Sequence, residues 1–230
     1  MSKNKLQKFS EVATFDNVYQ CFNSKEPSLV GKDFVEVELK GRWHAEHFGN
    51  QKPLTLELAC GRGEYTVGLA ERYPDRNFIG IDIKGARIWK GARQAIDRGL
   101  DNAAFLRARI ERLEYFFASG EVSELWLTHP DPFLKKPNRR LTSVGFLERY
   151  VRLLPAGAPI HLKTDNTELY EYTVEIAESY PQVHLQYHTA DIDAHDELPV
   201  PELDIPTYYE RLHRSKGETI KYVRMTTRPA

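Results

Sequence analysis

The chain has 230 residues, a length that suits one large α/β domain, with or without an extension. Apolar residues make up 41% and aromatic residues 11% of it, which is ample for a core, and no stretch is long and apolar enough to span a membrane. The formal net charge is -1, so there is no overall attraction to nucleic acid, and such a partner must be held by local basic patches.

Other global features narrow the class of protein. The segment 1–9 is lysine-rich but lacks the apolar core of a signal peptide. The only cysteines are Cys21 and Cys60, so no disulfide framework is implied and we expect a reducing cytoplasm. The sequence leaves open whether the protein is a monomer or a homodimer.

The chain divides near residue 52. Residues 1–52 form a mixed, polar N-terminal extension, most apolar at 17–22, which Trp43 is expected to tether. From residue 53 to 230 apolar and polar segments alternate regularly. Strands are expected at 54–60, 77–82, 103–107, 123–128, 158–164, 183–188 and 218–225. Helices are expected at 63–73, 85–98, 110–118, 143–153, 166–179 and near 206–214. This pattern predicts an α/β fold with a doubly wound, mostly parallel, seven-stranded sheet, whose ligands bind beyond the carboxyl ends of the strands.

The most informative stretch is Leu54-Thr-Leu-Glu-Leu-Ala-Cys-Gly-Arg-Gly-Glu-Tyr65. A buried strand runs into a turn with Gly61 and Gly63 and then into a helix, so backbone N–H groups can approach a ligand closely. Glu57, near the end of the strand, would repel a pyrophosphate and suits a cationic ligand better.

The spacing after this turn argues against a dinucleotide. The next glycine is Gly68, so the G-x-G-x-x-G fingerprint fails. The next strand ends in Asp82, at the distance where an acid commonly binds ribose hydroxyls. Glu57 is suited to an ammonium group and Asp82 to a ribose, and together they favour S-adenosylmethionine over NAD. A glycine-rich turn with two incidental acids is the alternative.

A second informative stretch is Leu125-Trp-Leu-Thr-His-Pro-Asp-Pro-Phe-Leu-Lys-Lys-Pro-Asn-Arg-Arg-Leu141. An apolar strand runs into Pro-Asp-Pro, whose prolines restrict the loop around Asp131. Four cations follow at once: Lys135, Lys136, Arg139 and Arg140. A surface turn would look similar, but a fixed acid beside a basic rim also suits an enzyme that modifies nucleic acid. His129 either contacts the substrate or supports the loop.

One further cluster resembles a metal site. It consists of His188, Asp191, Asp193, His195 and Asp196. Because these residues fall in a polar connection bounded by prolines, we expect solvated loop residues and no metal.

At this point the chain resembles a known family. The pieces that carry the resemblance are Glu57-Leu-Ala-Cys-Gly-Arg-Gly, Phe78-Ile-Gly-Ile-Asp82, Pro130-Asp-Pro with Lys135-Lys136 and Arg139-Arg140-Leu141, His161-Leu-Lys-Thr-Asp165, and Thr207-Tyr-Tyr-Glu210. They resemble the bacterial tRNA (guanine-N7)-methyltransferase family, a class I group that uses S-adenosylmethionine, and they run in family order from about residue 53 to the C-terminus. The resemblance implies a methyltransferase domain over 53–230 that methylates guanine N7 in tRNA, at position 46 in the variable loop.

The resemblance also implies roles for individual residues. Asp131 is expected at the catalytic position. The expected cofactor residues are Glu57, Gly61, Gly63, Asp82, Arg109 and Asp131, and the expected substrate residues are Lys135, Arg139, Asp165, Thr207, Tyr208, Tyr209 and Glu210. Two positions depart from the family pattern: Phe133 stands where tryptophan is usual, and Arg109 where many members carry an acid.

The chemistry fits these residue types. Guanine N7 is an unprotonated lone pair, so its methylation needs alignment more than a strong base. Arginine normally reads guanine at O6 and N7, but N7 must stay free here, so carboxylates such as Asp165 or Glu210 would read the Watson–Crick edge. A methyltransferase for a small molecule or a protein, and an RNA-binding module without activity, remain alternatives. The basic loop disfavours the first, and the three intact acids Glu57, Asp82 and Asp131 disfavour the second.

Overall fold

In a computed structural model, which describes residues 5–23 and 25–229, the chain forms an α/β fold around one ten-stranded sheet. The strands are β1 (Val18–Gln20), β2 (Leu29–Val30), β3 (Glu36–Val37), β4 (Leu54–Leu58), β5 (Asn77–Asp82), β6 (Ala103–Arg107), β7 (Glu124–Thr128), β8 (Pro159–Thr164), β9 (Val183–Thr189) and β10 (Lys221–Thr227). Their order is β3-β2-β1-β6-β5-β4-β7-β8-β10-β9. All seven predicted strands are present. β6, β5, β4, β7 and β8 run parallel, and β10 is antiparallel to both its neighbours, so the predicted mostly parallel sheet is confirmed.

Helices cover both faces of this sheet. The α-helices are α1 (Lys5–Val12), α2 (Glu64–Arg72), α3 (Gly85–Asp97), α4 (Leu113–Phe116), α5 (Val144–Leu153), α6 (Thr167–Ser179) and α7 (Tyr208–Arg214). Short helical turns lie at Lys32–Phe34, Trp43–His47, Ile110–Arg112, Pro137–Arg139, Ile192–Ala194 and Pro201–Asp204. The helix predicted at 110–118 is therefore shorter, because only 113–116 is α-helical.

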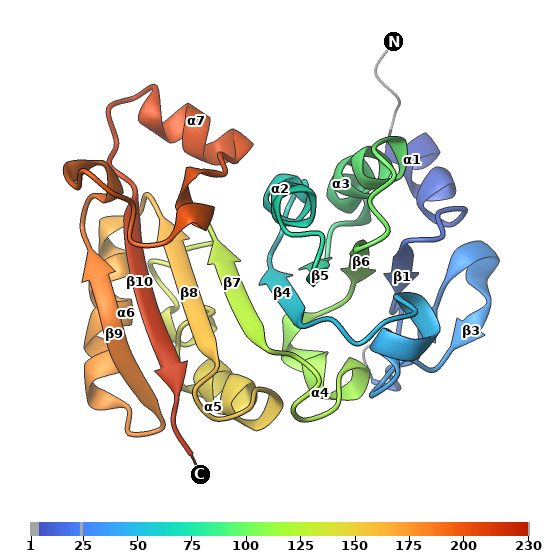
Figure 1. Ribbon diagram of the computed structural model, residues 1–230, viewed down its shortest axis with the longest axis horizontal. Helices are drawn as coiled ribbons and strands as arrows, with labels where there is room; N and C mark the ends of the chain where they lie inside the picture. The colour runs from blue at the N-terminus through green and yellow to red at the C-terminus, as the bar shows by residue number, and fades with distance from the viewer. Residues whose placement is uncertain (1–4, 24, 230) are drawn as a thin grey trace.

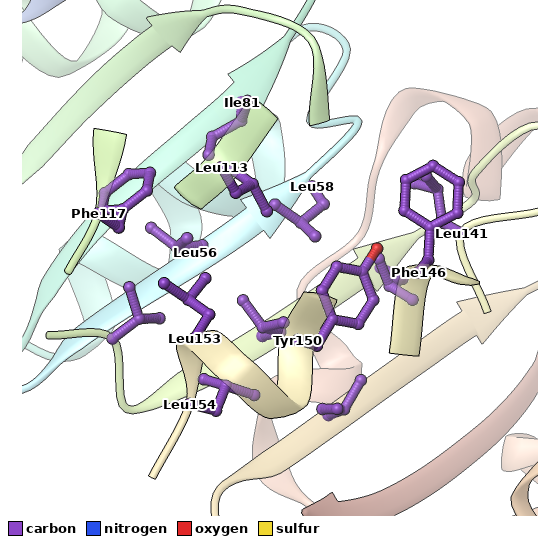
Figure 2. Packing of buried hydrophobic residues seen from close by; sticks show 14 of the residues in the cluster. Leu56, Leu58, Ile81, Leu113, Phe117, Leu141, Phe146, Tyr150, Leu153 and Leu154 are labelled. Atoms are coloured by element: carbon purple, nitrogen blue, oxygen red, sulfur yellow. The ribbon is translucent and has the colours of Figure 1, made fainter. Parts of the chain in front are cut away.

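The two-residue period of a strand sends alternate side chains of β4 to opposite faces. Leu54, Leu56 and Leu58 pack on the face covered by α4, α5 and α6, where Figure 2 shows Leu56 and Leu58 beside Tyr150 and other apolar side chains. Glu57 points to the other face, where its carboxylate meets α2. The alternation of leucines along β4 thus leaves Glu57 on the face of the sheet that α2 covers.

The carboxyl ends of the parallel strands form one edge of the molecule. The connections that follow β4, β5, β6, β7 and β8 all leave at this edge, and Figure 1 shows α7 lying beyond the ends of β7 and β8. The functional residues predicted at strand ends are therefore gathered at one edge, as expected for a doubly wound sheet.

The N-terminal extension belongs to the same sheet. β1 pairs in parallel with β6, with Gln20 opposite Arg107, and β2 and β3 add two short antiparallel strands outside it. Trp43 is fully buried and donates from Nε1 to the Phe116 carbonyl at 2.8 Å, which confirms the predicted tether. The predicted division near residue 52 thus separates two segments that share one sheet. In the part of the chain that the structure describes, no helix is both long and apolar enough to cross a membrane.

Candidate active site

The two glycines after β4, Gly61 and Gly63, are needed for different structural reasons. Both lie in the left-handed region, with φ of 56° at Gly61 and 68° at Gly63. A Cβ on Gly63 would collide with the Phe105 ring, whereas a Cβ on Gly61 would meet nothing closer than the Ala59 carbonyl at 4.0 Å. Gly63 is therefore required for packing, while Gly61 leaves a bare stretch of backbone facing the carboxyl edge.

Glu57 is a buried carboxylate whose hydrogen-bond donors are all neutral. Its side chain accepts from the Thr66 backbone N–H at 2.8 Å and from the hydroxyls of Thr66 and Thr128. Burial raises the pKa of Glu57 to about 7, against the opposing effect of these hydrogen bonds. Since a cation would favour the charged form, this position suits a positively charged ligand group.

Asp82 fixes the glycine turn. One carboxylate oxygen accepts from the Gly61 N–H at 3.0 Å and the other from the Lys84 N–H at 2.7 Å. These bonds join the ends of β4 and β5 and hold the backbone of the turn in place.

The residues next to Asp82 form part of a hollow of about 210 Å³. Ile83, which is 49% exposed, lines it together with Arg107, Arg109 and Arg112, and Phe22 reaches it from the N-terminal extension. Arg109 thus lines the same hollow as the residue that follows Asp82.

A second pocket lies at the ends of β4 and β7. It is lined by Glu57, Ala59, Cys60, Gly61, Arg62, Glu64, Tyr65, Arg87, Thr128, His129, Thr207, Tyr208 and Tyr209. The structure therefore brings the predicted cofactor residues Glu57 and Gly61 together with the predicted substrate residues Thr207, Tyr208 and Tyr209, which lie about 150 residues further along the chain.

The start of α7 closes one side of this second pocket. The Thr207 hydroxyl caps the helix by accepting from the Glu210 N–H at 3.1 Å, and the Tyr208 N–H donates to Glu64 at 2.5 Å. The Arg62 guanidinium lies 4.0 Å from the centre of the Tyr208 ring, and Tyr208 is 41% exposed. Tyr209 is half-buried and packs edge-on against Tyr208.

Asp131 stands in the exposed loop after β7. Its carboxylate accepts from the Phe133 N–H at 3.1 Å, and the residues on either side of Pro-Asp-Pro both have positive φ, 48° at His129 and 41° at Phe133. Such values are unusual for residues other than glycine, so the loop around Asp131 has a specific conformation that its surroundings must support.

The basic cluster of this loop divides into two parts. Lys135, Lys136 and Arg139 are exposed. Arg140 is not: its side chain is 3% exposed, donates to the Pro132 carbonyl at 2.8 Å and pairs with Glu168. Arg140 therefore does not belong to the exposed basic rim predicted from the sequence, because its guanidinium fastens the loop to α6.

Glu210 and Asp165 lie close together, on either side of the His129 imidazole. Their two sequence motifs did not predict this arrangement. Glu210 is 2% exposed and forms ion pairs with Lys163 at 2.6 Å and with Arg214 at 3.0 Å. Burial opposes its charge, but His129 and these cations lower the pKa of Glu210 to about 2. Asp165 is more accessible, at 18%, and its carboxylate accepts from His129 Nδ1 at 2.8 Å. One signal for this cluster is present in the sequence: Lys163 lies inside an apolar strand, where a charge needs a partner.

The polar connection at 188–196 holds ordinary side-chain contacts. His195 Nε2 lies 2.9 Å from the Thr189 hydroxyl, and Asp193 pairs with Arg214. Among the residues that the structure describes, the group that could hold a metal lies elsewhere: Asp165, His213 and Glu218. His213 lies between the other two: its Nδ1 is 2.6 Å from Glu218 Oε2 and 3.4 Å from Asp165 Oδ2.

Comparisons with known proteins agree with this geometry. A family model described as "Putative methyltransferase" matches residues 51–223. The tRNA (guanine-N(7)-)-methyltransferase of Bacteroides thetaiotaomicron is 46% identical over 224 residues, covering 97% of this chain and 86% of that protein. The protein of the same name from Cytophaga hutchinsonii is 40% identical over 232 residues, covering both chains completely.

Solved structures show the same fold at lower identity. The crystal structure of the 16S rRNA methyltransferase KamB superimposes with a TM-score of 0.66 at 19% identity, covering 87% of this chain and 98% of that one. A 16S rRNA (adenine(1408)-N(1))-methyltransferase from Catenulisporales acidiphilia, solved with its cosubstrate, gives a TM-score of 0.56 at 16% identity, covering 85% of this chain and 94% of that one. These matches show the class I methyltransferase fold. With 40–46% identity over nearly its whole length, the chain belongs to the tRNA (guanine-N7)-methyltransferase family.

Proposed function

We propose that this protein transfers a methyl group from S-adenosylmethionine to N7 of guanine at position 46 of tRNA. The observation that carries the proposal is the pocket shared by Glu57, Gly61 and the Thr207–Tyr209 segment, in a chain that belongs to this family. In this pocket a buried acid that suits a cation lies near the exposed ring of Tyr208, which suits a base.

The residues at the carboxyl edge suit S-adenosylmethionine. Glu57 would face its cationic methionine end and the bare backbone of Gly61 would lie against it. Asp82 would accept from the ribose hydroxyls, and Ile83 and Arg109 would flank the adenine. When bound, S-adenosylmethionine supplies a methyl group activated by a sulfonium.

The chain's own residues supply alignment and charge. In the transfer, guanine N7 would take the methyl group, and the electron pair of the broken carbon–sulfur bond would stay on sulfur. No proton is removed from N7, so rate depends on holding the reacting atoms in line. Positive charge moves onto the purine, and the carboxylate of Asp131 stabilises it there.

Recognition of guanine is assigned to the α7 side of the pocket. Exposed Tyr208 offers a surface for a base to stack on, an interaction worth about 1–3 kcal/mol. Asp165 has the accessible carboxylate for the N1–H and amine of the Watson–Crick edge. Glu210 is covered by its ion pairs, so it would reach a base only if Lys163 or Arg214 moved away.

The tRNA backbone is assigned to the exposed cations Lys135, Lys136 and Arg139, which follow the Asp131 loop. We infer that the enzyme works in the cytoplasm, where its two cysteines stay reduced. Sedimentation of the purified chain would separate the monomer from the homodimer.

The test is methylation of unmodified tRNA by the purified chain with labelled S-adenosylmethionine, followed by mapping of the modified nucleoside. We expect 7-methylguanosine at position 46. A matched tRNA with 7-deazaguanosine at that position lacks the reacting nitrogen and should take up no label there. Label on another nucleoside, or on a small molecule or protein instead of tRNA, would contradict the proposal.

A further inference from the structure

His129, the residue between β7 and the Pro-Asp-Pro loop, has an unusual backbone and a buried side chain. Its φ is 48°, in the left-handed region that is unfavourable for a residue with a Cβ. Its side chain is 5% exposed, and its backbone N–H donates to the Lys163 carbonyl at 2.8 Å. The residue is therefore held in place by its neighbours, two positions before Asp131.

Its imidazole lies between the two carboxylates assigned to guanine. Nδ1 is 2.8 Å from Asp165 Oδ1, at the end of β8, and Nε2 is 3.9 Å from Glu210 Oε2, on α7. The ring is also parallel to that of His213, with 6.4 Å between centroids. One side chain thus bonds the Asp131 loop to the end of β8 and faces the Glu210 carboxylate on α7.

The charges around this imidazole come from several elements. They are Lys163 and Asp165 at β8, Glu210, His213 and Arg214 on α7, Glu218 after α7, and Lys221 on β10, whose ammonium donates to the Asp165 carbonyl. Burial by itself lowers the pKa of His129, but the bond with Asp165 and the Glu210 carboxylate raise it above its ordinary value. The same bond helps keep the pKa of Asp165 low, although burial opposes this, so the pair is ionic.

We propose that His129 is a positioning residue for methyl transfer: its bond to Asp165 holds the left-handed backbone that presents Asp131, and its ring lies against the helix that carries Glu210. The inference rests on the proposed function. It deepens that function by making the alignment of Asp131 depend on a side chain that need not touch the reacting atoms.

Two substitutions separate the effect of the backbone conformation at residue 129 from the effect of the side-chain bond to Asp165. His129→Gly permits a positive φ without strain but removes the anchor. His129→Asn tolerates the same φ and can donate its amide N–H to Asp165, but carries no charge. In single-turnover methylation of tRNA at pH 7, we expect the rate of His129→Gly to fall about tenfold or more, because small misplacements are costly in proximity catalysis. Affinities for S-adenosylmethionine and tRNA should stay within about twofold. His129→Asn should recover only part of the rate, because it keeps the hydrogen bond to Asp165 without the charge.

The pH dependence gives a second readout. Because the pKa is raised, the anchoring charge is complete below the ordinary value and is lost as the pH rises through the folded-state pKa. The wild-type rate should therefore fall on the alkaline side, and this fall should be absent in His129→Asn. NMR titration of the imidazole, which needs no activity, should show His129 titrating above its ordinary 6.5.

The outcomes are distinguishable. If the wild type methylates tRNA and His129→Gly matches it in rate and pH profile, the inference is overturned. If His129→Gly does not fold, the pH profile of His129→Asn decides. A methylation rate that still falls at alkaline pH in His129→Asn overturns the inference. If the wild type does not methylate tRNA, the proposed function fails, and an imidazole that titrates below 6.5 would separately remove the anchor.

Discussion

His129 Nδ1 lies 2.8 Å from Asp165 Oδ1, which connects the end of β7 to the end of β8 at the edge where the predicted active site is built. The bond spans 36 residues of sequence and joins two motifs that had separate explanations, a catalytic loop and a guanine-reading acid. Through this bond, the conformation of the Asp131 loop depends on the position of Asp165.

The raised pKa of Glu57 predicts proton release when the cofactor binds. At pH 7 a carboxyl group with a pKa of about 7 is about half protonated, and a cationic ligand drives it to the charged form. Binding of S-adenosylmethionine should then release about half a proton and tighten as the pH rises from about 6 to about 8. Calorimetry in two buffers of different ionisation enthalpy measures this release. Glu57→Gln, which has no proton to lose, is the control, and equal release in both proteins would contradict the assignment.

The exposed part of the basic loop predicts a change in salt dependence. Replacing Lys135, Lys136 and Arg139 together with alanine should weaken tRNA binding and reduce the slope of log affinity against log salt by about 1 for each phosphate that is no longer neutralised. A charge-preserving triple, Lys135→Arg, Lys136→Arg and Arg139→Lys, should keep the slope. An unchanged slope in the alanine variant would place tRNA elsewhere. Arg140 is left out because it is buried against Pro132.

The place of Arg109 predicts a modest role in cofactor binding. It lines the hollow beside Ile83, where its flat guanidinium can pack on an adenine or pair with Asp82. Such interactions are worth about 0.5–1 kcal/mol at exposed sites, so Arg109→Ala should weaken S-adenosylmethionine binding about two- to fivefold. Arg93→Ala, whose guanidinium pairs with Asp97 on α3, should have no effect. Equal affinities of Arg109→Ala and wild type by calorimetry would make Arg109 a surface residue.

Much of this arrangement could be predicted from the sequence, because apolar periodicity and strand ends are local signals. They located the seven main strands and the acids Glu57, Asp82 and Asp165 at one edge. The three strands of the N-terminal extension were missed because segments of two or three residues, such as Val18–Gln20, carry no alternation. Arg139 and Arg140 are identical in type and adjacent, and only the position of α6 decides that one is exposed and the other buried.

The accessible carboxylate of Asp165 predicts how guanine is distinguished from inosine, which keeps N7 but lacks the exocyclic amine. If Asp165 accepts from that amine, Asp165→Ala, which has no acceptor, should lose most of the preference for guanosine, a discrimination of about 1–3 kcal/mol. The measurement is kcat/KM on tRNAs with guanosine or inosine at position 46. Glu210→Ala tests the covered carboxylate in the same way. If both variants discriminate as well as wild type, neither acid reads the amine.

Asp131 is tested most directly by single-turnover methylation of tRNA with Asp131→Asn, at saturating S-adenosylmethionine. The asparagine keeps the oxygen that accepts from the Phe133 N–H, so the loop should hold its shape while the charge is removed. Because we propose that this charge stabilises the positive purine, we expect the rate to fall about 100-fold or more, with tRNA affinity unchanged. A single-turnover rate close to that of the wild type would show that Asp131 is not the catalytic position.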